Sequence, residues 1–282
     1  HLRLVNKPFY DEEHLHPLDR ALAAQKETSV WLKKNSMTNI KWAPRIRWGA
    51  LIDVPNINGS TKSQTPVVGM ALDLKSSNSL EIQRLQLKKS LIKGRLPKNL
   101  NEMLMGNSLA KDLDVALGQS VTVIGQSFDG GLVADNYQVV GFIRFGVTAM
   151  DKKMVLIDIA DAQNTFYMEN MVTDWLGFLP SSLSFNHYVK AKKIINFNLD
   201  TWKKNPPKDW AKDDQPIALS ILDQQNMESM VKTFTIIKSS VVGIFTFLMV
   251  LVLWNAGVLS GIHRYGEMGL RLAFGESHWK LV

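Results

Sequence analysis

The chain has 282 residues, 45% of them hydrophobic, so it can bury a full core, and a wholly disordered chain is excluded. Lys and Arg outnumber Asp and Glu by 33 to 26, but they form no run interleaved with aromatic residues, which argues against a nucleic-acid groove. There is no cysteine, so disulfides, thiolate metal sites and cysteine nucleophiles are excluded.

Residues 1 to about 222 show the mixture of short segments that is typical of an α+β fold. Runs rich in branched side chains and bounded by turn formers predict strands at Leu2–Val5, Ile46–Val54, Val67–Leu72, Val121–Ile124, Tyr137–Phe145, Met154–Ile159 and Ile217–Ile221. Helices are expected from Pro17 to Lys34, from Ser108 to Leu113 and from Ala160 to Tyr167. The pair Asp129-Gly130 favours a hairpin turn between two of the strands, because it tolerates positive backbone angles.

A long apolar segment follows this region. No charged residue occurs between Lys238 and His263, and as a helix the residues from Val241 to Ile262 would span roughly 33 Å, enough for the hydrocarbon core of a bilayer. We predict a transmembrane helix at 236–262. The alternative, a core helix of a soluble protein, is disfavoured because such helices seldom stay apolar on every face.

The residues just before the span continue its helical pattern. Apolar side chains recur there at steps of three and four, with no Gly or Pro before the span, at Met227, Met230, Val231, Phe234 and Ile237. We therefore expect one rigid helix, with Asp223 or Asn226 as its N-cap.

Three residues inside the span are predicted to contact other membrane helices. Gly257 and Gly261 form a small-xxx-small pair, which lets two helices approach closely. Asn255 is costly in lipid and should face protein or a water-lined cavity. Glycine is also common in membrane helices generally, so an incidental origin of the pair stays open.

A motif lies directly after the span: Arg264-Tyr-Gly-Glu267-Met268-Gly269-Leu270-Arg271-Leu-Ala-Phe274-Gly275. In spacing and residue type it resembles the segment of MacB/FtsX-like ABC transporter permeases that leads into the contact with the ATPase. Glu267 and Arg271 are four residues apart, in the favourable order for a helical ion pair. Met268, Leu270 and Phe274 would offer apolar contacts to the ATPase or to adjoining membrane helices, and Gly275 suits a helix end.

A second stretch carries the same resemblance. The segments Met105–Ala110 and Tyr137–Gly141 look like the core of the extracytoplasmic domain of these permeases. Lys93-Gly94-Arg95 is similar to the E-G-R of the family, with Lys in place of the acid. The resemblance covers nearly the whole chain and is strongest at 91–162 and 238–282.

The resemblance implies an α+β extracytoplasmic domain of two subdomains, porter-like and inserted Sabre-like, followed by one transmembrane helix. Residues 1–235 would lie outside the cytoplasm, with 76–184 as the inserted subdomain, and 263–282 would form a cytoplasmic coupling segment. The chain is then expected to be a fragment, with one membrane helix before His1 and two after Val282.

The resemblance also implies a mechanotransmission permease of the inner membrane, in which a cytoplasmic ABC ATPase drives a shape change in the periplasm. Further implied partners are a second permease copy or paralogue, membrane lipids, and an extracytoplasmic substrate or carrier. LolC/LolE-like lipoprotein release is the favoured role, beside export of periplasmic substrates. The alternative is an FtsX-like signalling protein that regulates an extracytoplasmic cell-wall enzyme.

No catalytic, cofactor or metal site is predicted. The patterns G-x-x-x-x-G-K-[ST], H-E-x-x-H and G-x-S-x-G are absent, so ATP hydrolysis would belong to a partner. His1, His14 and His16 lie near acidic residues, but a solvated turn explains them more simply than a metal site. Six tryptophans could line a surface for a lipid or partner, although core packing is the commoner explanation: Trp31, Trp42, Trp48, Trp175, Trp202 and Trp210.

Overall fold

The structure, a computed structural model, describes residues 1–36, 40–56, 58–76, 78–180, 185–223 and 227–275. The chain divides into two units, His1–Ile221 and Leu222–Val282. The first unit is an α+β domain, as the sequence predicts. The second is dominated by one long helix, α9 (Met227–Ala273), which the short turn η3 (Ile221–Asp223) precedes in the chain.

Ten strands in the described part of the first unit form one mixed sheet. They are β1 (Leu2–Asn6), β2 (Lys41–Pro55), β3 (Thr61–Leu72), β4 (Leu91–Gly94), β5 (Glu102–Gly106), β6 (Ser120–Gln126), β7 (Leu132–Ile143), β8 (Met154–Asp158), β9 (Asp174–Phe178) and β10 (Pro216–Ser220). Their order is β10-β1-β9-β2-β3-β8-β5-β7-β4, and β6 pairs with both β2 and β7.

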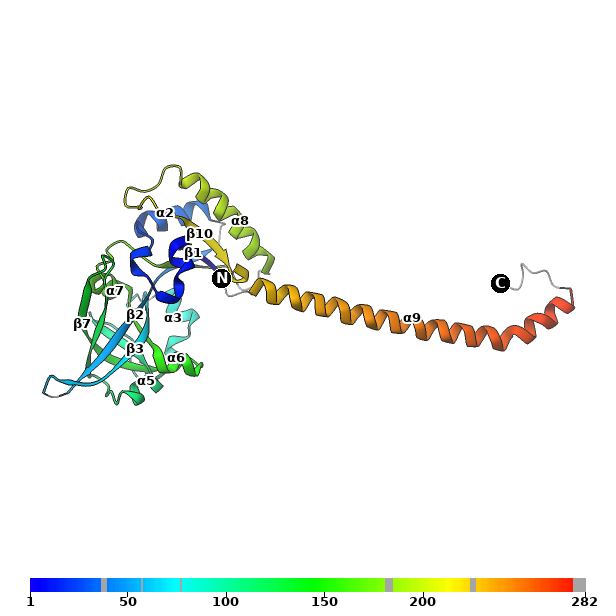
Figure 1. The fold of residues 1–282 in the computed structure, drawn as a ribbon, viewed down its shortest axis with the longest axis horizontal. Coiled ribbons are helices and arrows are strands. Elements are labelled where there is room, and N and C mark those ends of the chain that lie inside the picture. The colour runs from blue at the N-terminus through cyan, green and yellow to red at the C-terminus, as the bar shows by residue number, and fades with distance from the viewer. Residues whose placement is uncertain (37–39, 57, 77, 181–184, 224–226, 276–282) are drawn as a thin grey trace. The chain divides into compact units, whose positions relative to one another are not determined.

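Six of these strands close into a barrel. β2 pairs with β3, β3 with β8, β8 with β5, β5 with β7, β7 with β6, and β6 again with β2. Closure removes the open edges that would otherwise invite pairing with another chain. Strands β9, β1 and β10 lie outside this ring, and Lys41–Arg45 of β2 pairs with β9 before Ala50–Asp53 pairs with β6 (Figure 1).

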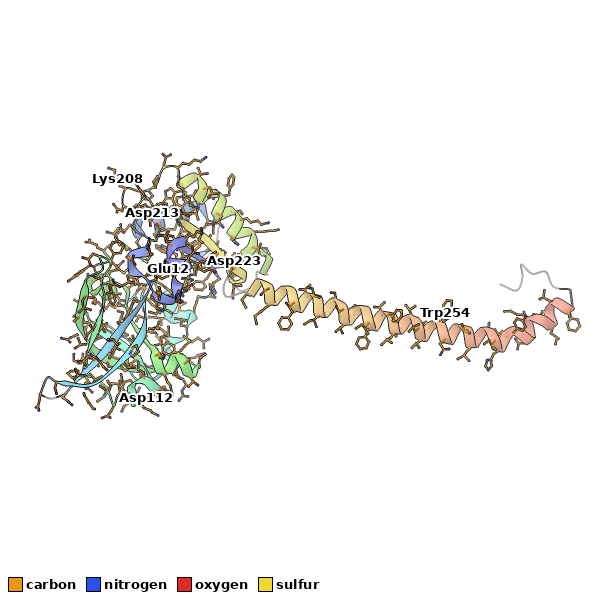
Figure 2. The ribbon with its side chains drawn as sticks, in the orientation of Figure 1. Glu12, Asp112, Lys208, Asp213, Asp223 and Trp254 are labelled. Atoms are coloured by element: carbon orange, nitrogen blue, oxygen red, sulfur yellow. The ribbon has the colours of Figure 1, made fainter. Side chains whose placement is uncertain are left out.

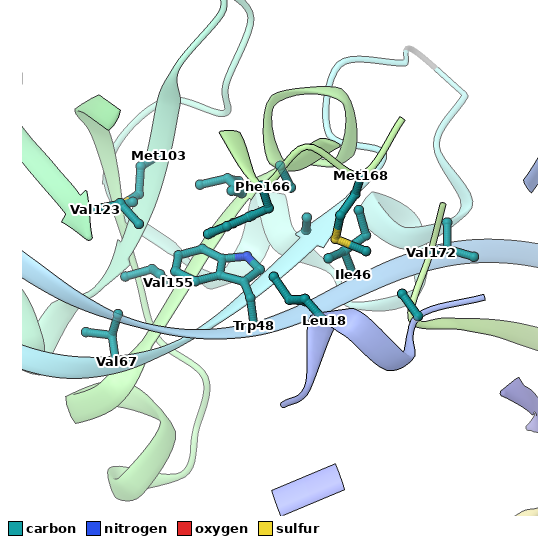
Figure 3. Close-up of a cluster of buried hydrophobic side chains, with 14 of the residues drawn as sticks. Leu18, Ile46, Trp48, Val67, Met103, Val123, Val155, Phe166, Met168 and Val172 are labelled. Carbon is teal, nitrogen blue, oxygen red and sulfur yellow. The ribbon is translucent and has the colours of Figure 1, made fainter. Parts of the chain in front are cut away.

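The barrel is filled by large apolar side chains around Trp48. The indole of Trp48 is fully buried, and its ring centroid lies 5.1 Å from that of Phe166 (Figure 3). Gly69 on the neighbouring strand makes room for it, because a Cβ there would lie 1.9 Å from the indole. A side chain at residue 69 and Trp48 therefore exclude each other.

Short helices connect and cover the strands. They are α1 (Lys7–Asp11), η1 (Glu13–Leu15), η2 (Leu18–Arg20), α2 (Gln25–Asn35), α3 (Leu80–Arg84), α4 (Leu87–Ser90), α5 (Asn107–Asp112), α6 (Thr148–Lys153), α7 (Ile159–Thr165) and α8 (Phe185–Trp202). Helices α2 and α8 lie together beside β1 and β10 (Figure 1), and Asn198 donates a hydrogen bond to the carbonyl of Asn35 at 2.9 Å.

The tryptophans serve the core of the first unit. Trp48 and Trp175 are buried, and the other four pack against the same hydrophobic cluster. Trp31 and Trp202 stack with ring centroids 4.6 Å apart, and Trp210 meets Trp202 edge-on at 4.5 Å. The expectation of core packing is confirmed.

One predicted helix is wrong in its extent. The segment from Pro17 to Lys34 forms the turn η2, then an extended stretch, and helix α2 begins at Gln25. Leu22 pairs with Val172 by a bridge, and Ala24 has a left-handed backbone with φ of 57°. Burial of Leu18 and Leu22 against the barrel outweighs the local helical preference.

Several elements escaped the sequence analysis. Strands β4, β5 and β9 are short, and β9 is buried at every residue, so it shows no alternation. The seven predicted strands are all present, with β2 and β3 longer than expected and β7 beginning at Leu132. The hairpin at Asp129-Gly130 joins β6 to β7, with φ of 86° at Gly130.

The division of the domain at residues 75 and 184 stays a prediction. The strand pairing provides no natural break there, because β3 joins β2 to β8 across residue 75. The change of partner along β2, between Arg45 and Ala50, is where the outer strands give way to the barrel.

Candidate functional site

Helix α9 and the two residues that follow it, Phe274 and Gly275, carry all of the site residues predicted from the sequence. The helix has 47 residues, which corresponds to about 70 Å of unbroken helix. The most apolar 18-residue stretch within Thr233–Ala273 has a mean hydropathy of 2.4, and among the described residues α9 is the one helix long and apolar enough to cross a membrane. Helix α9 runs without a break from Met227 into the apolar segment. Asn226 lies outside the described residues, and Asp223 ends the turn η3.

The apolar side chains of α9 are exposed within the chain itself. None of the most apolar window of the helix is buried, and Trp254 is 73% exposed (Figure 2). Exposing so many large side chains to water is unfavourable in proportion to their apolar area. This stretch therefore needs lipid or other helices as its surroundings.

The polar side chains in and beside the span differ in whether they have a hydrogen-bond partner within the helix. Thr246 donates to the carbonyl of Val242 at 2.8 Å, and Ser239 donates to that of Ile236 at 2.9 Å. The side-chain amide of Asn255 makes no hydrogen bond in the described part of the chain. An unsatisfied amide in hydrocarbon is costly, so Asn255 requires a partner from outside this helix.

The three predicted packing residues divide over two faces. At 100° per residue, Gly257 and Gly261 lie about 200° and 240° around the helix from Asn255. Gly243 falls on the glycine side as well, and a Cβ built at any of the three glycines meets nothing within 4 Å. The glycines form a smooth face, and Asn255 belongs to the opposite side.

The motif after the span continues the same helix to Ala273. Arg264, Glu267 and Arg271 share one face, with Leu270 and Phe274 on one side of it. Met268 and Leu272 lie on the other side of the charged face. Phe274 is 82% exposed and Leu270 is 63% exposed, so apolar contacts are open on both flanks of the charges.

The helix ends as the glycine predicts. Gly275 has φ of 89°, and its amide donates to the carbonyl of Leu272 at 3.0 Å. Glycine adopts this left-handed conformation without the steric cost of a Cβ. An ion pair between Glu267 and Arg271 was expected. Among the described residues, none of the ion pairs within 4.0 Å joins these two side chains. Both side chains lie on an exposed surface, where such a pair contributes little.

The strand that precedes α9 in the chain is held by side chains that the sequence analysis missed. On α8, Asn196 accepts from the amide of Ala218 at 2.8 Å and donates to its carbonyl at 3.0 Å. Asn6 accepts from the amide of Gln215 at 2.8 Å. Ala191, Ile195 and Leu199 of α8 are buried at steps of four, a helical signal that could have revealed this element.

A group of charges, the junction cluster, lies where β2 changes partners and consists of the buried Arg3 and Asp174 and the half-buried Glu13 and Arg47. Arg3 contacts Glu13 at 2.7 Å and Asp174 at 3.0 Å. Arg47 reaches Asp174 at 3.1 Å and also contacts Glu13. The cluster joins β1, β2, β9 and η1 at one point. Burial of Arg3 opposes its charge, but the two carboxylates outweigh this and raise the pKa of the guanidinium.

The histidines near the amino terminus take no part in a metal site in the described structure. No group of three or more His, Cys, Asp or Glu side chains among the described residues could hold a metal ion. Burial of His16 lowers the pKa of its imidazole, and repulsion by the neighbouring Arg47 lowers it further. Its surroundings disfavour a charged ring.

Comparison with known proteins found similar structures but no similar sequence. No protein-family model matches the chain, and no curated protein matches it significantly. The periplasmic region of MacB from Actinobacillus actinomycetemcomitans is similar with a TM-score of 0.49 and 10% identity, covering 82% of this chain and 92% of that one. The extracellular domain of the noncanonic ABC-type transporter YknZ from Gram-positive bacteria is similar with a TM-score of 0.46 and 11% identity, covering 78% and 99%. At these values neither likeness assigns an activity or partner to this chain.

Proposed function

We propose that this chain is a permease subunit of an ABC transporter, in which a partner ATPase drives a change of shape in an extracytoplasmic domain. The observation that carries the proposal is the continuity of α9. One helix joins the apolar span to the motif Arg264–Gly275 without interruption. A displacement at one end of such a helix reaches the other end, whereas a flexible linker would absorb it.

The backbone of α9 supports the role of a rigid lever. The helix contains no proline, and within it no residue has a positive φ in the described structure. Kinks in helices arise mainly at proline, glycine–serine pairs or bulges, and α9 continues without a break through its one such pair, Ser260-Gly261. Because the span itself has few polar groups that could bind water or substrate, we infer that movement rather than passage of cargo through α9 is its contribution.

The attachment of the domain supports the same role. Strand β10 precedes η3 in the chain and pairs with β1 over five residues, from Leu2 opposite Ser220 to Asn6 opposite Pro216. The junction cluster then ties β1 to β9 and β2. A pull on the end of β10 would thus reach the barrel through paired strands and buried ion pairs.

Within this proposal, the large domain would lie outside the inner membrane and residues 263–282 in the cytoplasm. A second permease copy or a paralogue would cover the glycine face or supply the partner of Asn255. We favour lipoprotein or lipid-linked cargo, the role that the resemblance to LolC/LolE-like permeases implies. Export of other periplasmic substrates is the next candidate.

Single-cysteine variants test the proposal cleanly, because the chain has no cysteine of its own. Phe274→Cys carries a thiol-linked photocrosslinker in native membranes, and we expect it to capture a protein with a P-loop ATPase sequence. Leu132→Cys, 83% exposed on the domain, serves as the matched control and should capture no ATPase. Ser127 is unsuitable for this purpose because it is 1% exposed.

The same two variants test the topology. A membrane-impermeant maleimide added to intact spheroplasts should label Leu132→Cys and leave Phe274→Cys unlabelled until the membrane is opened. Equal labelling from outside would contradict the proposed orientation. Absence of any P-loop protein from the Phe274→Cys crosslinks would remove the reason for calling residues 264–275 a coupling segment.

A further inference from the structure

A cavity of about 530 Å³ opens beside helices α3 and α4 and the loop after β4. Its volume lies within the range of small-molecule sites. Four lysines line it: Lys75, Lys88, Lys89 and Lys98. No aspartate or glutamate is among its lining residues.

Three carboxylates near this cavity are engaged with cations, and a fourth, that of Asp73, accepts a hydrogen bond from the amide of Ser76 at 3.1 Å. Asp161 contacts Lys75 at 2.7 Å, and Glu81 accepts from Arg45 at 2.8 Å. Glu102 lies between Arg95 and the amide of Lys98, and the hydrogen bond from Arg95 does most to hold its pKa below the usual range. These acids therefore leave the remaining lysines of the cavity uncompensated.

Three of the lysine ammonium groups are free to meet an anion. In the described part of the chain no ion pair or side-chain hydrogen bond engages the ammonium groups of Lys88, Lys89 or Lys98. Lys88 and Lys89 are exposed consecutive residues of α4. Like charges that line one cavity raise the local concentration of anions there.

The floor of the cavity is apolar rather than charged. Leu74 is 2% exposed, and it belongs to a hydrophobic cluster against which Ile82 and Leu96 pack. All three line the cavity. Three free cations beside an apolar floor match a molecule with an anionic head and a hydrophobic chain.

We propose that this cavity binds an anionic amphiphile, with a phosphate-bearing head at the lysines and an apolar chain over Leu74, Ile82 and Leu96. The site lies wholly within the His1–Ile221 unit, so it is independent of the proposed role of α9. A free phosphate and a phosphate on a lipid share the head chemistry. The apolar floor distinguishes them, because it stabilises only the ligand that carries a chain.

Calorimetric titration of the full chain in phosphatidylcholine nanodiscs tests this proposal, with empty nanodiscs subtracted. The probes are dihexanoyl phosphatidic acid, dihexanoyl phosphatidylcholine and inorganic phosphate. We expect the phosphatidic acid to bind saturably, and the other two at least roughly tenfold more weakly, since each lacks either the net charge or the chain.

Two double variants separate the site from general charge. Lys88→Gln with Lys89→Gln should weaken phosphatidic acid binding roughly tenfold. Lys152→Gln with Lys153→Gln removes the same charge from exposed residues of α6 outside the cavity and should leave binding unchanged. All four residues are exposed, so both variants should fold, which circular dichroism checks.

The apolar half of the site has its own variant. Leu96→Gln should weaken binding of phosphatidic acid while leaving any binding of inorganic phosphate unchanged. The proposal is overturned if no probe binds, if phosphatidylcholine or inorganic phosphate binds as tightly as phosphatidic acid, or if the α4 and α6 variants have equal effects.

Discussion

The His1–Ile221 unit and helix α9 use the same side chains in opposite surroundings. Trp48 is enclosed by the barrel and 0% exposed, whereas Trp254 on α9 is 73% exposed. The domain finds its apolar surroundings within its own fold, because its strands close around them. A single helix cannot enclose anything, so α9 must obtain apolar surroundings from a bilayer or from other helices.

Polar groups show the same contrast. In the domain, Arg3 and Asp174 are almost fully buried yet paired with each other. On α9, Asn255 makes no hydrogen bond among the described residues, although it lies in the apolar span. The two buried charges of the domain thus have each other as partners, whereas the side-chain amide of Asn255 has no partner among the described residues. In the proposed transporter, another membrane helix would supply the partner of Asn255.

The largest effect is expected from truncating the matched tryptophans. Trp48→Ala should lower the free energy of unfolding of the domain by about 3–5 kcal/mol, because it leaves a large cavity in the barrel. Trp254→Ala should change it by less than about 0.5 kcal/mol, because that side chain is 73% exposed and leaves no cavity. Urea titration followed by circular dichroism measures both, and equal losses would show that α9 is part of the domain core.

Removing one buried charge should be nearly as costly. Asp174→Ala leaves Arg3 buried with one carboxylate fewer, which is expected to cost about 3–5 kcal/mol. The matched change Asp112→Ala, at the exposed end of α5, should be nearly neutral. If both variants unfold at the same urea concentration, the junction cluster does not stabilise the domain.

A charge placed in the span tests whether α9 lies in a bilayer. Val250→Arg should raise the apparent free energy of membrane insertion by about 2.5–3.5 kcal/mol. Leu132→Arg, on the exposed rim of the barrel, should leave expression and insertion unchanged. Glycosylation-site mapping of membrane insertion reads out the result, and normal insertion of Val250→Arg would argue against a transmembrane α9.

The end of α9 should be sensitive to backbone conformation rather than to space. Gly275→Val forces a branched residue to φ of 89°, at a cost of about 1–2 kcal/mol, although no atom within 4 Å opposes its Cβ. We expect the domain to remain folded while ATP hydrolysis in the assembled transporter is uncoupled from release of cargo. Gly275→Asn, which tolerates this conformation, is the control and should keep most of the coupling.

The smallest effect concerns Glu102, which holds the loop after β4. Hydrogen bonds from Arg95 and from the backbone amides of Lys98 and Asn99 lower the pKa of the Glu102 carboxyl group. The ionised carboxylate therefore stabilises the folded state above the unfolded pKa of about 4.3, and this stabilisation is lost as the pH falls toward the folded pKa. Glu102→Gln should cost about 1 kcal/mol at pH 7. The difference between variant and wild type should shrink progressively below pH 4, and a constant difference would contradict this.

The sequence alone determined the features that depend on neighbouring residues. The span and its stalk follow from apolar residues repeated along one helix, and the left-handed end follows from Gly275. These signals survive without any tertiary contact, since each residue of a helix bonds to one four positions away. The same holds for the hairpin at Asp129-Gly130, whose strands are adjacent in the chain.

Only the tertiary structure decided the features that join distant residues. Closure of the barrel brings β2 to β6 and β3 to β8, and nothing local in these strands specifies a partner. The helix expected from Pro17 begins only at Gln25, because Leu22 pairs with Val172, which lies 150 residues away in the chain. The lysine cavity likewise combines α4 with the loop at Lys98. Such pairings are selected by total burial across the fold, which no window of sequence contains.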